Sequence, residues 1–97
     1  MLHIVNKSPT ERNSLASALA HALPGHALLL IEDAVYAGTT LGMAALAAAP
    51  AGVEIYVLTP DVQARGLGAS VADGIKQVDY KGFVELVAAQ PRVQSWL

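Results

Sequence analysis

The sequence lacks cysteine altogether. This absence excludes disulfides, thiolate metal sites and any thiol or persulfide chemistry on this chain. Charge is also scarce, because Asp, Glu, Lys and Arg make up only 14% of the 97 residues, well below the roughly 25% of an average domain. Little polar surface is therefore available to cover a small globule, and we expect an apolar face that a partner protein covers. A tight, alanine-rich core is the alternative.

The charges that are present do not form a basic surface. The six Lys and Arg are scattered along a chain of net charge −2, which argues against direct binding of nucleic acid. No apolar run is long enough to span a bilayer, and the first one lacks the charged segment of a signal peptide. We therefore expect a cytoplasmic protein without a membrane role.

Motifs for cofactors are missing as well. Gly66 and Gly68 neither follow a strand directly nor complete the three-glycine dinucleotide pattern. His3, His21 and His26 do not have the spacing of metal ligands. We expect His3 to be a hydrogen-bonded core residue and His21 to face solvent. The sequence therefore predicts no nucleotide, metal or other cofactor.

Strand and helix patterns alternate along the chain. Apolar or β-branched runs predict strands over 1–5, 27–31, 53–59 and 75–78, and helical patterns follow over 11–23, 39–48, 61–65 and 80–89. The helix at 39–48 is nearly all alanine and is expected to be weakly held. Residues 93–97 are an apolar tail with no room for an element of its own. Such alternation predicts an α/β protein, a single domain over 1–97 with a small parallel sheet flanked by helices.

Within the last predicted helix we expect three or four side chains to face inwards: Phe83, Val84, Val87 and, as a further candidate, Leu86. The third strand ends before Pro60, which cannot donate to a sheet ladder. It delivers a loop to the carboxyl end of the sheet, where α/β folds usually keep their working surface.

Four residues are candidates for an interface, on grounds of chemistry and position: Asp33, Tyr36, Arg65 and Trp96. Asp33 and Tyr36 follow the second strand, and as an alternative they are acid/base groups of an enzyme. Arg65 can pair with Asp61 across one helical turn or bind a carboxylate at an interface. Trp96 either closes the core or contacts a partner, because aromatic residues are enriched at interface anchors.

With these residues laid out, the chain resembles the TusB/DsrH family of sulfur-relay subunits over essentially its whole length. The resemblance is strongest in the run Tyr56-Val57-Leu58-Thr59-Pro60-Asp61-Val62-Gln63-Ala64-Arg65-Gly66. It also includes the break at residues 6–9, the stretch 28–37, Val78-Asp79-Tyr80 and the ending Gln94-Ser95-Trp96-Leu97. The sequence of residues 6–9 and 11–15 is closer to that of DsrH-type members than to that of TusB-type members.

The resemblance implies a DsrE-like fold with flavodoxin-like layering and two homologous partners, of TusC/DsrF and TusD/DsrE type, in a heterohexamer. It implies sulfur transfer that serves tRNA wobble-uridine 2-thiolation or dissimilatory sulfur oxidation. Some DsrH-type members have a cysteine on the first helix, where this chain has Ala18. No catalytic residue is therefore expected here, and our hypothesis is a non-catalytic structural subunit. A stand-alone homo-oligomeric scaffold or regulatory protein is the alternative.

Overall fold

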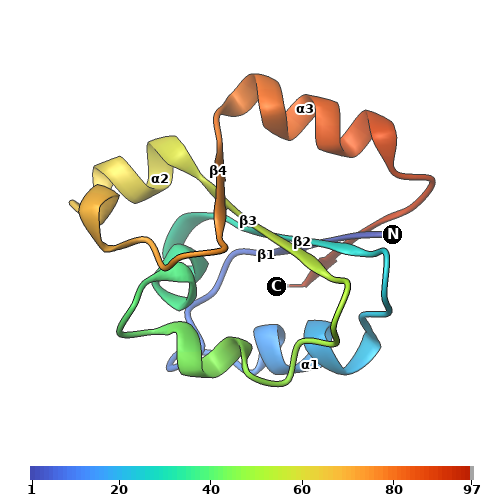
Figure 1. Ribbon diagram of the computed structural model, residues 1–97, viewed down its shortest axis with the longest axis horizontal. Coiled ribbons are helices and arrows are strands. Elements are labelled where there is room, and N and C mark those ends of the chain that lie inside the picture. Colours follow the sequence, from blue (N-terminus) through green and yellow to red (C-terminus); the bar gives the residue numbers. More distant parts are fainter. Residues whose placement is uncertain (97) are drawn as a thin grey trace.

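The computed structural model describes residues 1–96, and its framework is a sheet of five parallel strands (Figure 1). The strands are β1 (Leu2–Val5), β2 (Ala27–Leu30), β3 (Glu54–Leu58), β4 (Lys76–Val78) and β5 (Val93–Trp96). Their order is β4-β3-β2-β1-β5, and each neighbouring pair is parallel. The chain steps outward from β1 to β4 and then returns to the other side of β1. The predicted α/β class with a parallel sheet is confirmed.

Helical segments connect the strands and cover both faces of the sheet. The α-helices are α1 (Ser14–His21), α2 (Thr59–Ala64) and α3 (Tyr80–Ala89), and the 3-10 helices are η1 (Glu32–Gly38), η2 (Met43–Leu46) and η3 (Gly68–Ser70). In Figure 1, α1 lies below the sheet and α3 above it. Because the connection from β4 to β5 crosses the sheet in the opposite direction, a crossover of the same hand must use the opposite face. The result is a three-layer arrangement.

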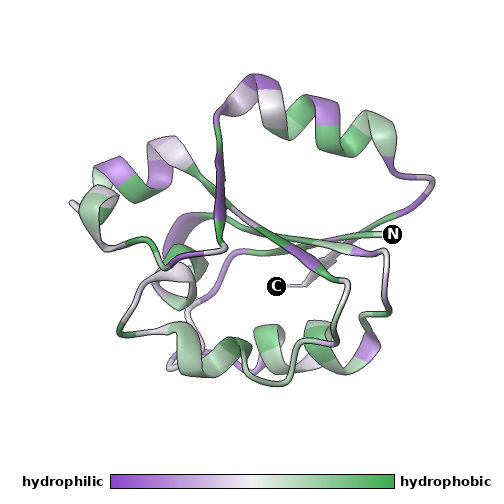
Figure 2. Ribbon diagram, in the orientation of Figure 1, coloured by the Kyte–Doolittle hydropathy of each residue, from purple (hydrophilic) through white to green (hydrophobic). Residues whose placement is uncertain are grey.

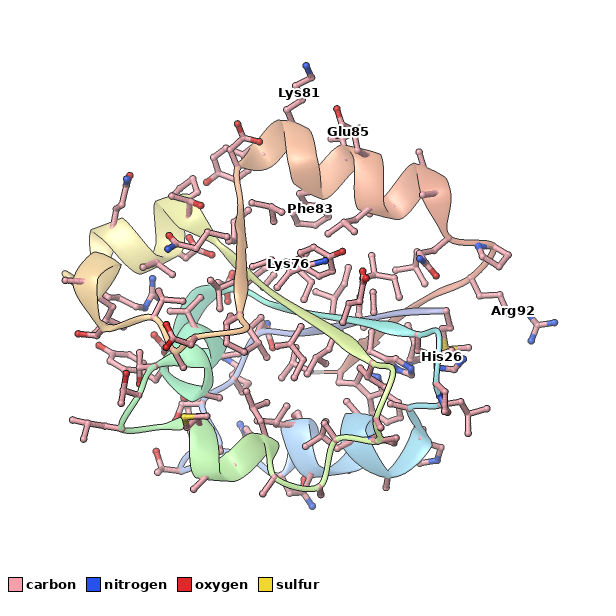
Figure 3. All side chains as sticks on the ribbon, in the orientation of Figure 1. His26, Lys76, Lys81, Phe83, Glu85 and Arg92 are labelled. Atoms are coloured by element: carbon pink, nitrogen blue, oxygen red, sulfur yellow. The ribbon has the colours of Figure 1, made fainter. Side chains whose placement is uncertain are left out.

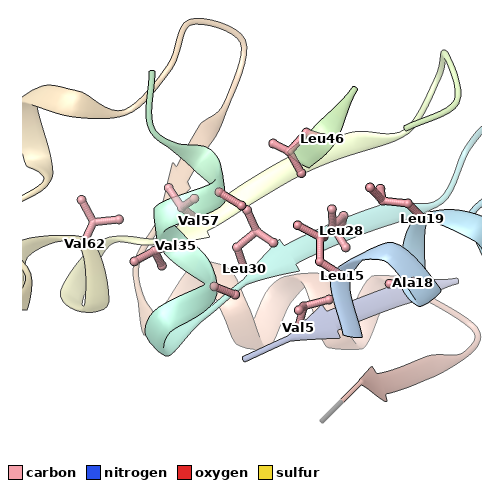
Figure 4. Packing of buried hydrophobic residues seen from close by; sticks show 12 residues of the cluster. Val5, Leu15, Ala18, Leu19, Leu28, Leu30, Val35, Leu46, Val57 and Val62 are labelled. Atoms are coloured by element: carbon pink, nitrogen blue, oxygen red, sulfur yellow. The ribbon is translucent and has the colours of Figure 1, made fainter. Parts of the chain in front are cut away.

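The larger part of the core lies between the sheet and α1 (Figure 4). All four residues of β2 are buried, as expected for a central strand with both faces covered. Leu28 and Leu30 point to the α1 side, and Leu29 points to the α3 side. Hydropathy follows the same plan, with hydrophobic residues along the central strands (Figure 2). Within residues 1–96, no helix is long and apolar enough to cross a membrane.

The prediction that the apolar tail at residues 93–97 has no room for an element of its own is wrong. Val93–Trp96 form β5, which pairs with β1 so that Trp96 lies beside Val5. The Leu2 N–H also donates to the Arg92 carbonyl at 2.9 Å. A strand this short can form because the outer edge of β1 already presents a fixed row of backbone donors and acceptors. Leu97 lies outside the described residues.

The prediction of a helix over 39–48 is also wrong. The connection from β2 to β3 contains two 3-10 helices, η1 and η2, and only Leu46 of η2 is buried. Alanine side chains bury little apolar area per residue, so this segment has too little contact to hold an α-helix. α1 is shorter than predicted as well. It begins at Ser14, because the N–H groups of Glu11 and Arg12 both donate to the Ser8 carbonyl in a preceding turn.

The last helix has the predicted bounds but covers its face of the sheet loosely. Asp79 caps α3, since its Oδ1 accepts a hydrogen bond from the Gly82 N–H at 2.8 Å. Phe83 and Leu86 pack toward the sheet, whereas Val84 and Val87 are exposed, contrary to the prediction. The 3.6-residue period turns Val84 away from the face that carries Phe83 and Leu86, and it places Val87 at the margin of that face, where Val87 is 37% exposed.

His3 is the one histidine inside the sheet, and it is fully buried. Its Nδ1 accepts the Trp96 indole N–H at 3.1 Å, and its Nε2 lies 3.0 Å from His26 Nδ1. This confirms a hydrogen-bonded core histidine, and His21 is exposed as predicted. Burial, followed by the charges of His26, the N-terminal amino group and His21, lowers the pKa of His3 below its usual value. The folded chain therefore holds His3 neutral.

We predict that acid destabilises the fold through His3. The unfolded chain protonates His3 near pH ~6.5, whereas the folded chain does so only at lower pH. The free energy of unfolding should be highest above about pH 6.5 and should fall as the pH drops toward the lowered pKa of His3. Urea unfolding at about pH 7.5 and about pH 5 measures the difference.

The matched controls are His3→Gln, which cannot titrate, and His21→Gln, which removes an exposed imidazole. His3→Gln should lower stability at neutral pH and flatten the pH dependence, while His21→Gln, which removes only the smallest of the causes that lower the pKa of His3, should keep most of the slope of the wild type. Equal slopes in the wild type and His3→Gln would contradict the assignment.

Candidate functional site

The carboxyl ends of β2 and β3 place two helical segments side by side. η1 follows β2 and α2 follows β3. η1 begins at Glu32, whose φ of 50° is unusual for a residue with a side chain. The Glu32 N–H donates to Asp61 Oδ2 at 2.6 Å. Asp61 on α2 therefore fixes the start of η1 and holds the two segments in register.

An ion pair then joins the same two segments. Arg65 Nε and Nη2 both donate to Asp33 Oδ1, at 3.1 and 2.9 Å, and Arg65 Nη1 donates to the Asp61 carbonyl at 3.2 Å. The structure thus brings Asp33 and Arg65 together, two of the four candidate residues. The predicted pairing of Arg65 with the Asp61 carboxylate is wrong, because that carboxylate binds the Glu32 N–H instead. Asp33 keeps its second oxygen available, and its side chain is half exposed.

Tyr36 projects from the end of η1 between two cavities of this edge. One, of about 530 Å³, is also lined by Pro9, Glu11 and Asp33. The other, of about 350 Å³, is also lined by Leu41. Tyr36 is 43% exposed. Three of the four candidates, Asp33, Tyr36 and Arg65, therefore belong to one edge of the sheet.

Exposed apolar side chains gather on the connection between β2 and β3. Leu41 is 98% exposed, and Met43 is exposed to nearly half. With Tyr36 they form what we call the carboxyl-edge patch: Tyr36, Leu41 and Met43. Sequence reasoning missed Leu41 and Met43, because it placed both in an alanine-rich helix. The signal was present, since Leu41 lies between Thr40 and Gly42, outside any regular apolar stripe.

A tight turn presents this patch. Thr39 Oγ1 donates to the Tyr36 carbonyl at 2.7 Å and accepts the Gly42 N–H at 3.1 Å. A Cβ at Gly42 would lie 2.0 Å from the Tyr36 carbonyl oxygen. Only glycine fits this position, so Gly42 sets the path of the chain between Tyr36 and Leu41.

The fourth candidate, Trp96, lies elsewhere. Its ring packs against the α1-side core and its indole N–H bonds His3, so it closes the core of the monomer. Ala18, at the position of the cysteine in some DsrH-type members, is fully buried on α1. A further residue that sequence reasoning missed is Asn6, whose buried Oδ1 accepts no hydrogen bond from residues 1–96. It follows β1 at the carboxyl edge.

The chemistry available at the carboxyl edge is binding rather than thiol transfer. It offers one carboxylate held by a guanidinium, a phenol and exposed apolar side chains, on a chain without cysteine. Within the part of the chain that the structure describes, no group of three or more His, Asp or Glu side chains could hold a metal ion.

The fold and this edge define a small three-layer α/β protein with a thiol-free binding edge. The same fold is seen in the crystal structure of ychN protein from E. coli, with a TM-score of 0.71, 20% identity and 97% of each chain covered. The family model of "DsrH like protein" matches residues 7–93. Protein TusB of Sodalis glossinidius is 36% identical over 99% of this chain and 100% of its own length. Protein TusB of Escherichia coli is 31% identical with the same coverage.

The chain therefore belongs to the TusB/DsrH family, as the resemblance predicted. The matches carry both the DsrH and the TusB names, so the closer kinship to DsrH stays a prediction.

We predict that Gly42→Ala disrupts the turn that presents the patch. The added methyl group would overlap the Tyr36 carbonyl, and the free energy of unfolding should drop by about 1–3 kcal/mol. Gly68→Ala is the matched control, because a Cβ there meets no atom within 4 Å. It should change stability by less than about 1 kcal/mol. Chemical denaturation of both variants measures the difference, and equal stabilities would show that the turn is not constrained as described.

Proposed function

We propose that this chain is a non-catalytic interaction subunit of a cytoplasmic sulfur-relay complex. It folds as a single domain over 1–97 and binds homologous subunits of TusC/DsrF and TusD/DsrE type in a heterohexamer. The observation that carries the proposal is an exposed apolar patch, next to an ion pair, on a chain that has no thiol.

The missing thiol assigns the chemistry to a partner. A persulfide forms on a thiolate sulfur, and this chain has no cysteine. Asp33, which could otherwise act as a general base, has one oxygen occupied by two guanidinium N–H groups. The sulfur-carrying residue is therefore a cysteine of a partner subunit, and this chain contributes surface and shape.

The carboxyl-edge patch is the proposed contact with that partner. Leu41 is almost entirely exposed, and burying such a side chain stabilises a complex by about 1.5–3 kcal/mol. Asp33 and Arg65 lie beside it and can extend their ion pair to polar groups at the rim. The small number of charges on the chain fits a protein whose surface is partly covered.

Two pathways fit a subunit of this kind, and we favour tRNA wobble-uridine 2-thiolation over dissimilatory sulfur oxidation. The support is that full-length relatives such as those of Sodalis glossinidius and Escherichia coli bear the name TusB. That name belongs to the branch of the family that the resemblance connects with tRNA.

We predict that sulfur never becomes covalently bound to this chain. The assembled complex is loaded with radiolabelled persulfide sulfur, and its subunits are separated without reductant. The label should be on a cysteine-containing partner, should be released from it by dithiothreitol, and should be absent from this chain. Label that remains on this chain after separation would overturn the proposal.

We further predict that Leu41→Asp weakens assembly. Native mass is measured for the chain alone and after co-expression with TusC-like and TusD-like proteins. The wild type should form one stable hetero-oligomer with equal stoichiometry, and Leu41→Asp should weaken it by about tenfold or more.

The matched control is Leu23→Asp, which introduces the same charge at another exposed leucine. Leu23 follows α1 at the opposite edge of the sheet, and this variant should assemble like the wild type. If the wild type forms the same homo-oligomer with and without partners, the scaffold function replaces the relay function. If both variants assemble normally, the carboxyl-edge patch is not the interface.

A further inference from the structure

A cavity of about 470 Å³ lies at the amino edge of the sheet, opposite the carboxyl-edge patch. It is bordered by the end of α1 and by the segments that enter β1, β2 and β5. Its walls include the rings of His21, His26 and Trp96 and the apolar side chains of Leu23 and Pro91. His26 and Arg92 are both labelled at this end of the molecule in Figure 3. The proposed function makes no use of this cavity.

A chain of hydrogen bonds fixes the protons on two of the histidines. The Trp96 indole can only donate, so His3 Nδ1 must be the acceptor of the 3.1 Å bond and neutral His3 carries its proton on Nε2. That N–H points to His26 Nδ1 at 3.0 Å, and the Leu23 N–H points to the same atom at 3.2 Å. His26 Nδ1 therefore accepts, and the proton of neutral His26 is on Nε2. No atom of residues 1–96 accepts that proton, so His26 offers a donor.

The third histidine is fixed by a backbone carbonyl. His21 Nδ1 lies 2.8 Å from the Ser17 carbonyl, which can only accept, so this nitrogen carries the proton. The His21 ring lies 5.1 Å from the Trp96 ring, with an angle of 36° between their planes. These two rings form an aromatic wall. These bonds occupy both nitrogens of His3 and the Nδ1 of His26, and no group of three or more His, Asp or Glu side chains among residues 1–96 could hold a metal ion.

The polar groups of the cavity suit a ligand that carries a negatively charged hydrogen-bond acceptor. Arg92 is the one charged side chain in the lining that the structure describes, and this lining contains no Asp or Glu. Arg92 forms no ion pair with any residue from 1 to 96. Its guanidinium and the His26 Nε2–H are donors, and the planar guanidinium matches the geometry of a carboxylate. An apolar, ring-lined cavity with a few convergent polar groups is the usual form of a small-molecule site.

We propose that this cavity binds a small aromatic carboxylate. The ring of the ligand packs between Trp96, His21 and the side chain of Leu23, and its carboxylate accepts from Arg92 and His26. The site is separate from the carboxyl-edge patch, so a ligand bound there does not compete with the contact proposed at that patch.

The single tryptophan of the chain gives a direct test. Because Trp96 lines the cavity, its fluorescence reports binding there. Benzoate is titrated against the wild-type chain, and its neutral analogue benzamide is titrated in parallel. Benzoate should give a saturable change in Trp96 fluorescence, and benzamide should bind at least about fivefold more weakly, because it cannot form a charge-assisted pair.

The matched variants are Arg92→Gln and Arg12→Gln, which remove the same charge from two exposed positions. Arg92→Gln should weaken benzoate binding by about fivefold or more, while Arg12→Gln, outside the cavity lining, should bind like the wild type. The proposal is overturned if benzoate gives no saturable change, if benzamide binds equally well, or if the two variants bind benzoate with the same affinity.

Discussion

A neutral imidazole inside the sheet holds the two ends of the described chain together. His3 accepts from Trp96 on β5 and donates to His26 at the entrance to β2. Both partners are satisfied only while His3 lacks a charge, since an imidazolium would place two hydrogens between Nδ1 and the indole. His3 therefore helps to position β5 against β1, supports the tautomer of His26 that the Leu23 N–H also requires, and forms part of the amino-edge cavity. A buried polar side chain of this kind specifies a structure because every alternative leaves a donor or acceptor unpaired.

The carboxyl edge is organised by a different constraint, which is backbone strain. A left-handed conformation at Glu32 costs about 1–2 kcal/mol. A charge-assisted hydrogen bond of the kind that Asp61 makes to the Glu32 N–H contributes a similar amount, so the two are nearly balanced. The strained turn directs η1 across the end of the sheet, and Asp33 meets Arg65 there. The two edges of the sheet are thus built independently, one from a neutral network and the other from charged groups, and they can serve different partners.

The sequence was a good guide to whatever depends on local pattern. The apolar run at 27–31 and the β-branched run that ends before Pro60 predicted β2 and β3, and the last helix was found at the predicted residues 80–89. What failed depends on distant contacts. β5 exists only because β1, some 90 residues earlier, offers it an edge. Arg65 binds Asp33, 32 residues away, in preference to its neighbour on the same helix, and no local rule ranks those two carboxylates.

The alanine-rich segment is a second case in which the local sequence pattern did not determine the structure. Alanine has the highest intrinsic helix propensity, and the pattern at 39–48 predicted a helix. Yet isolated helices of this length are marginal, and tertiary packing normally supplies their stability. Here Leu46 is the one buried residue of η2, and Ala45 packs against the core with only its small side chain, so tertiary packing adds little to the helix propensity of this segment. The same weakness leaves Leu41 and Met43 exposed and thereby creates the apolar surface on which the proposed assembly rests.

Packing gives a second reason, besides the lack of cysteine, why this chain does not suit sulfur transfer. Ala18 lies in the α1-side core with no exposed surface, on the face of α1 that covers the sheet. A thiol there would be surrounded by apolar side chains, which raise its pKa and keep it from acting as a nucleophile. Restoring a cysteine at this position would therefore not restore a working sulfur carrier unless α1 also moved away from the sheet. In the complex that we propose, this chain therefore contributes contact surface, and the transfer step takes place on a partner chain with an accessible cysteine.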